Sequence, residues 1–260
     1  MRVSAIQMEI GREFETNLEI ARRLIRKAAT MGSKIVCFPE YFALPPFSVM
    51  DLPTIYEQTY EATMAMLREL SRANKLCIVG GSLIRKRDDG LYFNTCPVYK
   101  NGTLIVLQDK IHVTTKERTW GLTGGLPDSL QVFDVNGVKG SVAICADILF
   151  PKTVSTVRDQ GVALLFVPLT SPVREKDVTK KNRDCLFVAR AFDNNVYVIK
   201  TGSVGRTASG VKIAGRSLVA GPQGVLLKAK SECDEEVLTV DLDLAELKEM
   251  DLVSQLFDAP

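Results

Sequence analysis

Short runs of apolar residues alternate along this chain with segments in which apolar residues recur every three or four positions. Such runs are typical of buried strands, and the three-to-four spacing is typical of amphipathic helices. The pattern predicts helices that start near residue 16 and end at Gly32, and others at 54–74, 153–160 and 176–194. It predicts strands at residues 3–8, 34–38, 76–84, 91–100, 131–135, 139–144, 163–168, 196–201, 217–220, 225–230 and 237–240.

Local signals support these boundaries. Thr16 and Glu19 have the spacing of a capping box, which predicts the start of the first helix. The dipeptides Asp89-Gly90, Asn101-Gly102 and Asn136-Gly137 favour tight turns between antiparallel strands. These signals predict three hairpins.

The order of elements points to a fold class. A strand, a helix, a second strand, a second helix and then several strands in hairpins occur twice along the chain. Two such halves predict an α+β protein in which two mixed sheets face one another with helices on the outside, a four-layer αββα sandwich. No linker rich in Pro, Gly or Ser divides the halves, so we expect a single domain over residues 1–260.

Composition narrows the class of protein. With 33 Lys+Arg against 31 Asp+Glu, the net charge of +2 gives no indication of a nucleic-acid or membrane partner. The longest apolar runs, such as residues 162–169, are too short to cross a bilayer. The six cysteines include no Cys-x-x-Cys pair, which favours free thiols in a reducing compartment. Since the start of the chain shows no signal peptide, we expect a cytoplasmic protein.

Cys145 ends an apolar run, Ser141-Val-Ala-Ile-Cys145, at a point where the chain turns towards a helix. Nucleophiles often occupy such strand-to-helix turns, where backbone N–H groups can hold an oxyanion. The chain has one histidine, His112, and no cluster of metal ligands, so a zinc site is not expected. The base that deprotonates Cys145 is therefore expected to be a carboxylate or an amine rather than an imidazole.

Two further reactive side chains follow buried strands. Glu40 comes after Phe38-Pro39, and Lys110 after Leu107-Gln-Asp109. If the strands lie side by side, Glu40, Lys110 and Cys145 meet at one edge of the sandwich.

Six segments resemble conserved motifs of the nitrilase (carbon–nitrogen hydrolase) superfamily, and they occur in the same order and at similar separations along the chain. They are Phe38-Pro-Glu40, Asp109-Lys-Ile-His112, Ile144-Cys-Ala-Asp147, Gly161-Val-Ala-Leu-Leu-Phe-Val-Pro168, Arg190-Ala-Phe-Asp-Asn194 and Gly215-Arg-Ser-Leu-Val-Ala-Gly-Pro222. The resemblance covers residues 1 to about 245 and implies an αββα sandwich of the nitrilase type, without a cofactor.

It also implies a role for each site residue. Cys145 would attack the substrate and form a thioester, and Glu40 would act as the general acid and base. Lys110 and the backbone N–H of Ala146 would stabilise the oxyanion. Glu117 resembles the family's second active-site glutamate, which would orient Lys110 or the attacking water.

The segment after the nucleophile departs from the family pattern. Ala146, Leu149 and Lys152 stand where a bulky residue, an arginine and a glutamate are common, and Asp193 replaces a glutamate. We expect Ala146, Leu149 and Thr170 to contact substrate. Outside the site, His112 is interpreted as structural, and Arg190 and Asp193 have the spacing of a helical ion pair.

The resemblance predicts a thiol amidohydrolase that cleaves a small linear amide, either aliphatic or an ω-amide, to a carboxylate and ammonia. Alternatives are an N-carbamoyl amine or amino-acid hydrolase and an inactive binding or scaffold protein of the same fold. The resemblance also implies a homodimer or a higher homo-oligomer. The apolar residues in the tail, residues 243–260, suit docking on a partner subunit.

Overall fold

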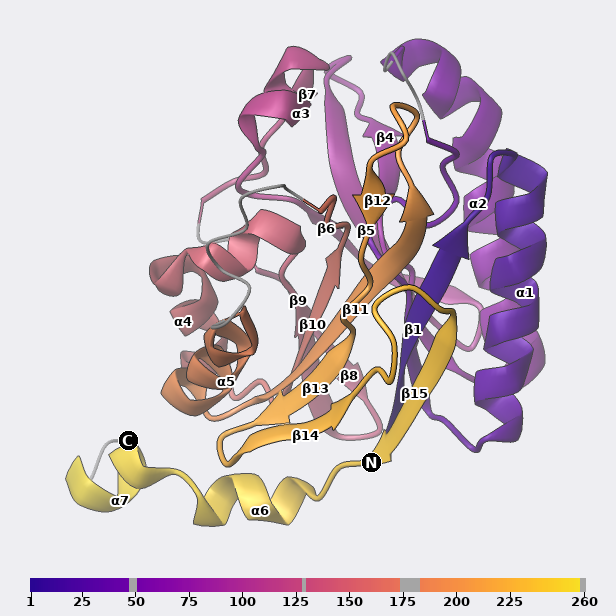
Figure 1. Cartoon of the computed structure of the whole chain (residues 1–260). Coiled ribbons are helices and arrows are strands. Elements are labelled where there is room, and N and C mark those ends of the chain that lie inside the picture. The colour runs from indigo at the N-terminus through magenta and orange to yellow at the C-terminus, as the bar shows by residue number, and fades with distance from the viewer. Residues whose placement is uncertain (47–50, 128–129, 174–182, 258–260) are drawn as a thin grey trace.

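Two β-sheets lie face to face between pairs of helices in the computed structural model (Figure 1). The structure describes residues 1–46, 51–127, 130–173 and 183–257, except for the side chains of residues 252, 253 and 257. The four-layer αββα sandwich predicted from the sequence is confirmed.

Among the described residues, the first sheet contains eight strands, which come from the two ends of the chain and from its first half. They are β1 (Arg2–Ile10), β2 (Ile35–Cys37), β3 (Cys77–Val79), β4 (Leu83–Lys86), β5 (Tyr92–Lys100), β6 (Thr103–Asp109), β7 (Leu122–Thr123) and β15 (Glu236–Asp241). In this sheet β1, β2 and β3 run parallel, whereas β4, β6 and β15 pair antiparallel with their neighbours. The sheet is therefore mixed, as expected.

The second sheet comes from the second half of the chain. It contains β8 (Val132–Val135), β9 (Val138–Val142), β10 (Leu164–Leu169), β11 (Tyr197–Arg206), β13 (Leu218–Gly221) and β14 (Gly224–Lys228). The two sheets are continuous at one corner, where Met8–Ile10 pair in parallel with Ser203–Gly205. Beyond that corner, β12 (Lys212–Ile213) forms a hairpin with the end of β11.

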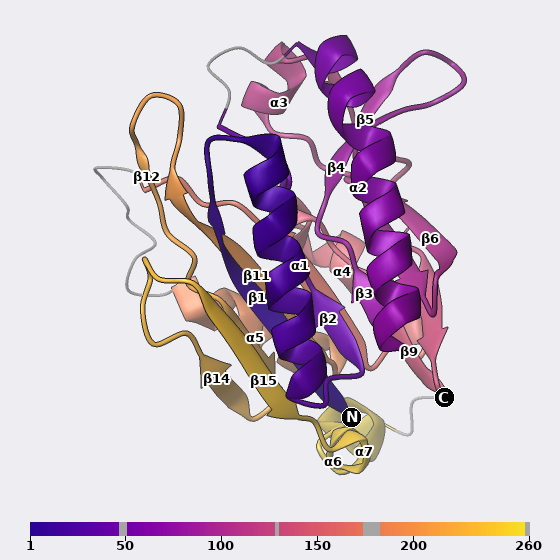
Figure 2. The same ribbon diagram turned by 90° about the vertical axis from the view of Figure 1, so that its right-hand side faces the viewer.

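Helices cover the outer faces. α1 (Phe14–Thr30) and α2 (Leu52–Asn74) pack on the first sheet, and α4 (Pro151–Asp159) and α5 (Arg183–Asn194) pack on the second (Figures 1 and 2). Among the described residues, three large apolar clusters form layers, one between the sheets and one beneath each pair of helices, and a smaller fourth cluster includes Leu52, Ile55 and Ile84. The layer between the sheets includes Val79, Ile144, Phe166, Tyr197 and Ile199.

The strand directions place several loops together. β1, β2, β9, β10 and β11 are linked by parallel pairings, so their carboxyl ends share one edge of the sandwich. β6 is antiparallel to β5, which is antiparallel to β3, so β6 also ends at that edge. The segments after β2, β6, β9 and β10 therefore come together.

Two local predictions are wrong. Thr16 does not cap α1, because the helix begins at Phe14 after Glu13 as the N-cap residue. The strand predicted at residues 76–84 is two strands, β3 and β4, because the chain turns at Gly81, which has φ of +62°. A Cβ atom at Gly81 would lie 2.1 Å from the carbonyl oxygen of Pro39, so the turn also keeps room for the loop that follows β2.

The remaining elements agree with the pattern to within a few residues. All three hairpins form, with residues in the left-handed region at Gly90, at Asn101-Gly102 and at Asn136-Gly137. The first part of the helix predicted at 176–194 lies outside the described residues, and the described part is α5.

The C-terminal segment lies along one end of the molecule as α6 (Leu244–Glu249) and α7 (Leu252–Phe257) (Figure 1). Leu242 and Leu247 are buried in the core between the sheets, and Asp251 pairs with Arg158 of α4 at 2.5 Å. Docking of this tail on a partner subunit stays a prediction. Within the described ranges, no helix combines the length and the apolar character needed to cross a membrane.

Candidate active site

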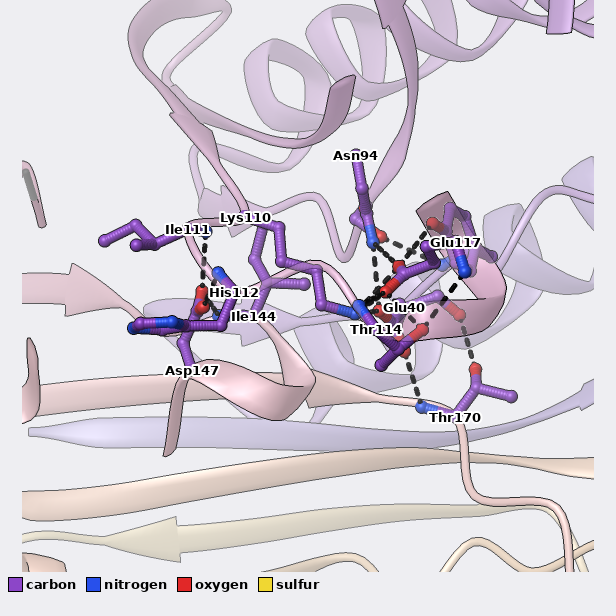
Figure 3. A network of polar contacts seen from close by, with 12 residues as sticks. Glu40, Asn94, Lys110, Ile111, His112, Thr114, Glu117, Ile144, Asp147 and Thr170 are labelled. Atoms are coloured by element: carbon purple, nitrogen blue, oxygen red, sulfur yellow. Dashed lines mark hydrogen bonds and ion pairs between the residues drawn. The ribbon is translucent and has the colours of Figure 1, made fainter. Parts of the chain in front are cut away.

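Three of the four predicted catalytic side chains form a buried charged cluster (Figure 3). Glu40 follows β2, Lys110 follows β6, and Glu117 lies in the short helix α3 (Thr115–Thr119). The ammonium of Lys110 donates to Glu40 Oε1 at 2.8 Å and to both carboxylate oxygens of Glu117 at 2.8 Å. All three residues are at most 3% exposed. Two carboxylates thus share one cation away from water.

The carboxylate of Glu117 is held by more donors than Lys110 alone. Oε1 also accepts hydrogen bonds from Tyr41 Oη at 2.9 Å and from Asn94 Nδ2 at 3.1 Å. Oε2 accepts from the backbone N–H of Thr114 at 2.8 Å and from its hydroxyl at 2.9 Å. Thr114 and Glu117 form a complete capping box at the start of α3. Glu117 is therefore fixed in position.

The two oxygens of Glu40 have different surroundings. Oε1 accepts from Lys110 Nζ and from Asn94 Nδ2 at 2.9 Å. Oε2 accepts from the backbone N–H of Thr170, the first residue after β10, at 3.1 Å. The hydroxyl of Thr170 donates to the carbonyl oxygen of Glu40 at 2.8 Å. The two strand ends are thereby linked.

Cys145 begins a short 3₁₀ helix, Cys145–Leu149, and two residues separate it from the end of β9. Its φ of +49° lies in the left-handed region, which is uncommon for a residue other than glycine and is often found at functional sites. The residue is partly exposed, and its thiol lies close enough to Glu40 to be affected by the charge of that carboxylate. Burial and the nearby charge of Glu40 raise the pKa of this thiol, so it is protonated at neutral pH.

Asp147 connects the loop that carries Lys110 to the loop that carries Cys145 (Figure 3). Its buried carboxylate accepts hydrogen bonds from the backbone N–H groups of Ile111 at 3.3 Å, His112 at 2.7 Å and Ile144 at 3.0 Å. Burial raises the pKa of Asp147 to about 6, against the opposing effect of these hydrogen bonds. The carboxylate fixes the two loops relative to one another.

The charges of the cluster depend on one another. Burial disfavours the charged form of Lys110, but the carboxylates of Glu40 and Glu117 outweigh this effect and raise its pKa. Burial raises the pKa of Glu40, and Lys110 only partly opposes this. For Glu117 the burial effect is outweighed by Lys110 and the surrounding donors, so its pKa is lowered. Of the two acids, Glu40 is the one better suited to accept a proton.

The predicted pocket residues differ in their exposure. Thr170 lies against Glu40, Ala146 next to Cys145 is partly exposed, and Leu149 is 57% exposed. The ring of His112 stacks on Phe150 with a centroid distance of 3.6 Å, and its Nε2 lies 2.8 Å from Thr153 Oγ1. The imidazole thus packs against the start of α4, as expected for a structural residue.

The predicted ion pair between Arg190 and Asp193 is present at 3.6 Å. The guanidinium of Arg190 also donates to the carbonyl oxygen of Ile148, at 3.1 Å. Arg190 therefore links α5 to the short helix that begins at Cys145.

The sequence interpretation missed Tyr41 and Asn94 as members of the site and noted Asp147 only as part of a motif. The signal available for Asn94 was a polar pair, Asn94-Thr95, within an otherwise apolar strand. Tyr41 gave no comparable signal, because it adopts φ of +55° in a loop and reaches Glu117 only in the folded chain.

A cavity of about 760 Å³ lies at the same edge of the sandwich, where β1 and β11 end. Its lining includes the basic residues Arg12, Arg206 and Lys212 and the acid Glu9. Positive charge therefore predominates on this part of the edge.

Comparison with known proteins identifies the family. The carbon-nitrogen hydrolase family model matches residues 2–251. The omega-amidase NIT2-B of Xenopus laevis is 31% identical over 264 residues, which cover 96% of this chain and 91% of that protein. The omega-amidase NIT2 of Homo sapiens is 31% identical over 263 residues, with the same coverage.

Solved structures share the fold. A carbon-nitrogen hydrolase from Helicobacter pylori matches with a TM-score of 0.86 at 19% identity, over 100% of this chain and 94% of that chain. Nit3 of Saccharomyces cerevisiae, a member of the nitrilase superfamily, matches with a TM-score of 0.86 at 23% identity, over 99% and 95%. The chain belongs to the carbon-nitrogen hydrolase family. It is an enzyme that hydrolyses non-peptide amide bonds.

Proposed function

We propose that this enzyme hydrolyses the terminal amide of a small linear acid, an ω-amide, to a carboxylate and ammonia, with Cys145 as the nucleophile. The observation that carries the proposal is the buried cluster in which Lys110 pairs with both Glu40 and Glu117, with the Cys145 thiol near enough to Glu40 for the carboxylate to affect its pKa. This arrangement provides a nucleophile, a base and a cation at one point.

The reaction follows from the protonation states. Glu40 accepts the proton of the thiol as sulfur attacks the amide carbon, since the thiol by itself is protonated at neutral pH. Lys110 and the backbone N–H of Ala146 stabilise the negative charge on the former carbonyl oxygen. Glu40 then protonates the leaving nitrogen, ammonia departs, and a thioester remains. Water, deprotonated by Glu40, hydrolyses the thioester and restores the thiol.

Lys110 can stabilise an oxyanion only if one of its hydrogens becomes available. In the structure its three short contacts all go to carboxylate oxygens, two of them to Glu117. Glu117 has four other hydrogen bonds, to Tyr41, Asn94 and Thr114, so it can release one contact at little cost. We assign Glu117 the role of orienting Lys110, because an acid with so many donors is a poor base.

The acidic end of the substrate is supported by the relatives at 31% identity, which are described as omega-amidases. Hydrolysis of an N-carbamoyl amine or amino acid is the alternative, because the same cluster suits both reactions.

We further propose a cytoplasmic enzyme that forms homodimers or larger homo-oligomers. The six cysteines are free, which is typical of a reducing compartment. The exposed apolar side chains of Leu149, Phe150 and Phe192 lie on or next to α4 and α5, where a second subunit would cover them.

Ammonia release tests the proposal. Wild type and Cys145→Ser are incubated with a monoamide of a dicarboxylic acid, a neutral amide of equal length and an N-carbamoyl amino acid. We expect the wild type to release ammonia fastest from the monoamide and the variant to release almost none. Equal release by the two proteins would exclude the thiol mechanism, and a preference for the carbamoyl compound would favour the alternative.

A further inference from the structure

Asn94 contacts three members of the charged cluster from near the start of β5 (Figure 3). Its side-chain nitrogen Nδ2 donates to Glu40 Oε1 at 2.9 Å and to Glu117 Oε1 at 3.1 Å. Its backbone carbonyl accepts from the backbone N–H of Lys110 at 2.8 Å. Asn94 is 0% exposed, so no water competes for these bonds from the surface.

The orientation of the amide is determined by charge. If the amide were turned over, Oδ1 would face two carboxylate oxygens, and both hydrogen bonds would become repulsions. With Nδ2 towards the acids, Oδ1 is buried and has no donor among the residues that the structure describes. A buried acceptor without a donor destabilises a fold. The folded protein nevertheless keeps Oδ1 without a described donor, because this orientation preserves the two hydrogen bonds from Nδ2 to the carboxylates.

Another buried asparagine shows the difference. Asn17 in α1 uses both ends of its amide, since Oδ1 accepts from the N–H of Gly11 at 2.7 Å and Nδ2 donates to the carbonyl of Ala43 at 3.3 Å. That pattern supports the fold. Asn94 instead directs both hydrogens to ionisable side chains and leaves its acceptor unused.

The bond to Glu40 has a consequence for proton transfer. Oε1 of Glu40 already accepts from Lys110 and Asn94, whereas Oε2 accepts one backbone N–H, from Thr170. Oε2 is therefore the oxygen with capacity for a proton. A hydrogen bond to the charged form of an acid also stabilises that form. Asn94 thus opposes the burial that raises the pKa of Glu40.

We propose that Asn94 is a positioning residue of the reaction: its amide holds Glu40 and Glu117 around the Lys110 ammonium, keeps Glu40 ionised and directs the thiol proton to Glu40 Oε2. This inference rests on the proposed function, because it assigns Glu40 as the base of Cys145. It goes further in naming an uncharged residue that sets the protonation of that base.

The test compares Asn94→Leu with wild type in two assays across pH. The first follows alkylation of Cys145 by iodoacetamide, measured by mass spectrometry on the peptide that contains this cysteine. The second follows ammonia release from the best amide substrate. Both rates depend at low pH on ionised Glu40. Loss of the Asn94 hydrogen bond should move the acid limb of each profile to higher pH by about one unit and lower kcat roughly 10- to 100-fold.

A matched control uses Asn194, which is buried at the end of α5 and donates to the carbonyl of Arg190 at 2.8 Å. Asn194→Leu removes an amide of the same size at the opposite end of the strands and should leave the acid limbs unchanged. Asn94→Asp preserves the side-chain volume if Asn94→Leu fails to fold. Its acid form can donate to one carboxylate but not to both, so it should also move the acid limb to higher pH.

Acid limbs of the Asn94 variants that coincide with those of wild type would overturn the inference. An equal displacement in Asn194→Leu would also overturn it, by showing a general effect of destabilisation. Failure of the proposed function would look different. The wild type would then release no ammonia from any amide, and the alkylation profiles would still decide whether Asn94 sets the protonation of Glu40.

Discussion

Replacing Lys200 by methionine should stabilise this protein. Lys200 lies in β11, is 2% exposed and is not part of the candidate active site. Its ammonium lies 4.8 Å from the ring centroid of Phe187 in α5. Burial lowers the pKa of Lys200 from 10.5 to about 8, although Asp184 partly opposes this. The folded protein thus holds a charge at neutral pH that its surroundings disfavour.

The magnitude follows from the two pKa values. The interval between 10.5 and about 8 corresponds to about 3 kcal/mol of destabilisation at pH 7. Methionine has a similar volume and no charge, but it loses the contact with Phe187, which is worth about 0.5–1 kcal/mol. We expect a net gain of about 2 kcal/mol, which for a chain of this size raises Tm by roughly 4–8 °C.

The dependence on pH distinguishes this cause from better packing. Because the pKa of Lys200 is lowered in the folded state, the unfolded chain binds the extra proton between about pH 8 and 10.5. The stability of the wild type therefore rises across this interval. The advantage of Lys200→Met should be greatest below pH 8 and should shrink as the pH approaches 10.5.

Urea unfolding at fixed protein concentration between pH 6 and 10 measures this difference, with the exposed Lys34→Met as a control that should change little. The reasoning is refuted if Lys200→Met is no more stable than wild type at pH 7. It is also refuted if the gain is the same at every pH, since packing alone would then account for it.

Two further predictions concern the site. Lys110→Met leaves Glu40 and Glu117 buried without their cation. We expect the free energy of unfolding, measured in urea at pH 7, to fall by about 3–5 kcal/mol, with a smaller loss at acid pH, and kcat to fall by about 100-fold or more. An unchanged free energy of unfolding would contradict the buried pairing. Asp147→Asn turns an amide N–H₂ towards backbone donors and loosens the link between the loops of Lys110 and Cys145. We expect kcat to fall about 100-fold with KM nearly unchanged in steady-state assays, and a change confined to KM would argue against this role.

The positions of Glu40, Lys110 and Cys145 could be predicted because each follows a buried strand. The alternation of strands and helices indicates how the strands run, and ends of parallel strands share an edge. That reasoning needs only the local pattern and the order of elements. The same reasoning could not predict Asn94, which lies within a strand. Asn94 joins the site through contacts with Glu40, 54 positions before it, and Glu117, 23 positions after it.

The two capping signals show the same limit. Thr16-Asn-Leu-Glu19 and Thr114-Thr-Lys-Glu117 have the same spacing, yet only the second is a capping box in the structure. The first helix starts earlier, and the amide of Asn17 bonds to Gly11. At the second position Tyr41, Asn94 and Lys110 all converge on Glu117. The local pattern permits a cap, and the tertiary contacts decide whether it forms.

The sequence by itself determined the α+β class, the two halves and the three reactive residues at strand ends, because periodicity and residue type are local properties. Only the tertiary structure decided how protons and charges are distributed among those residues. Burial raises the pKa of Glu40 and of the Cys145 thiol, whereas Glu117 stays ionised among its donors. Desolvation and hydrogen bonding depend on what surrounds a side chain, and those neighbours come from distant parts of the chain.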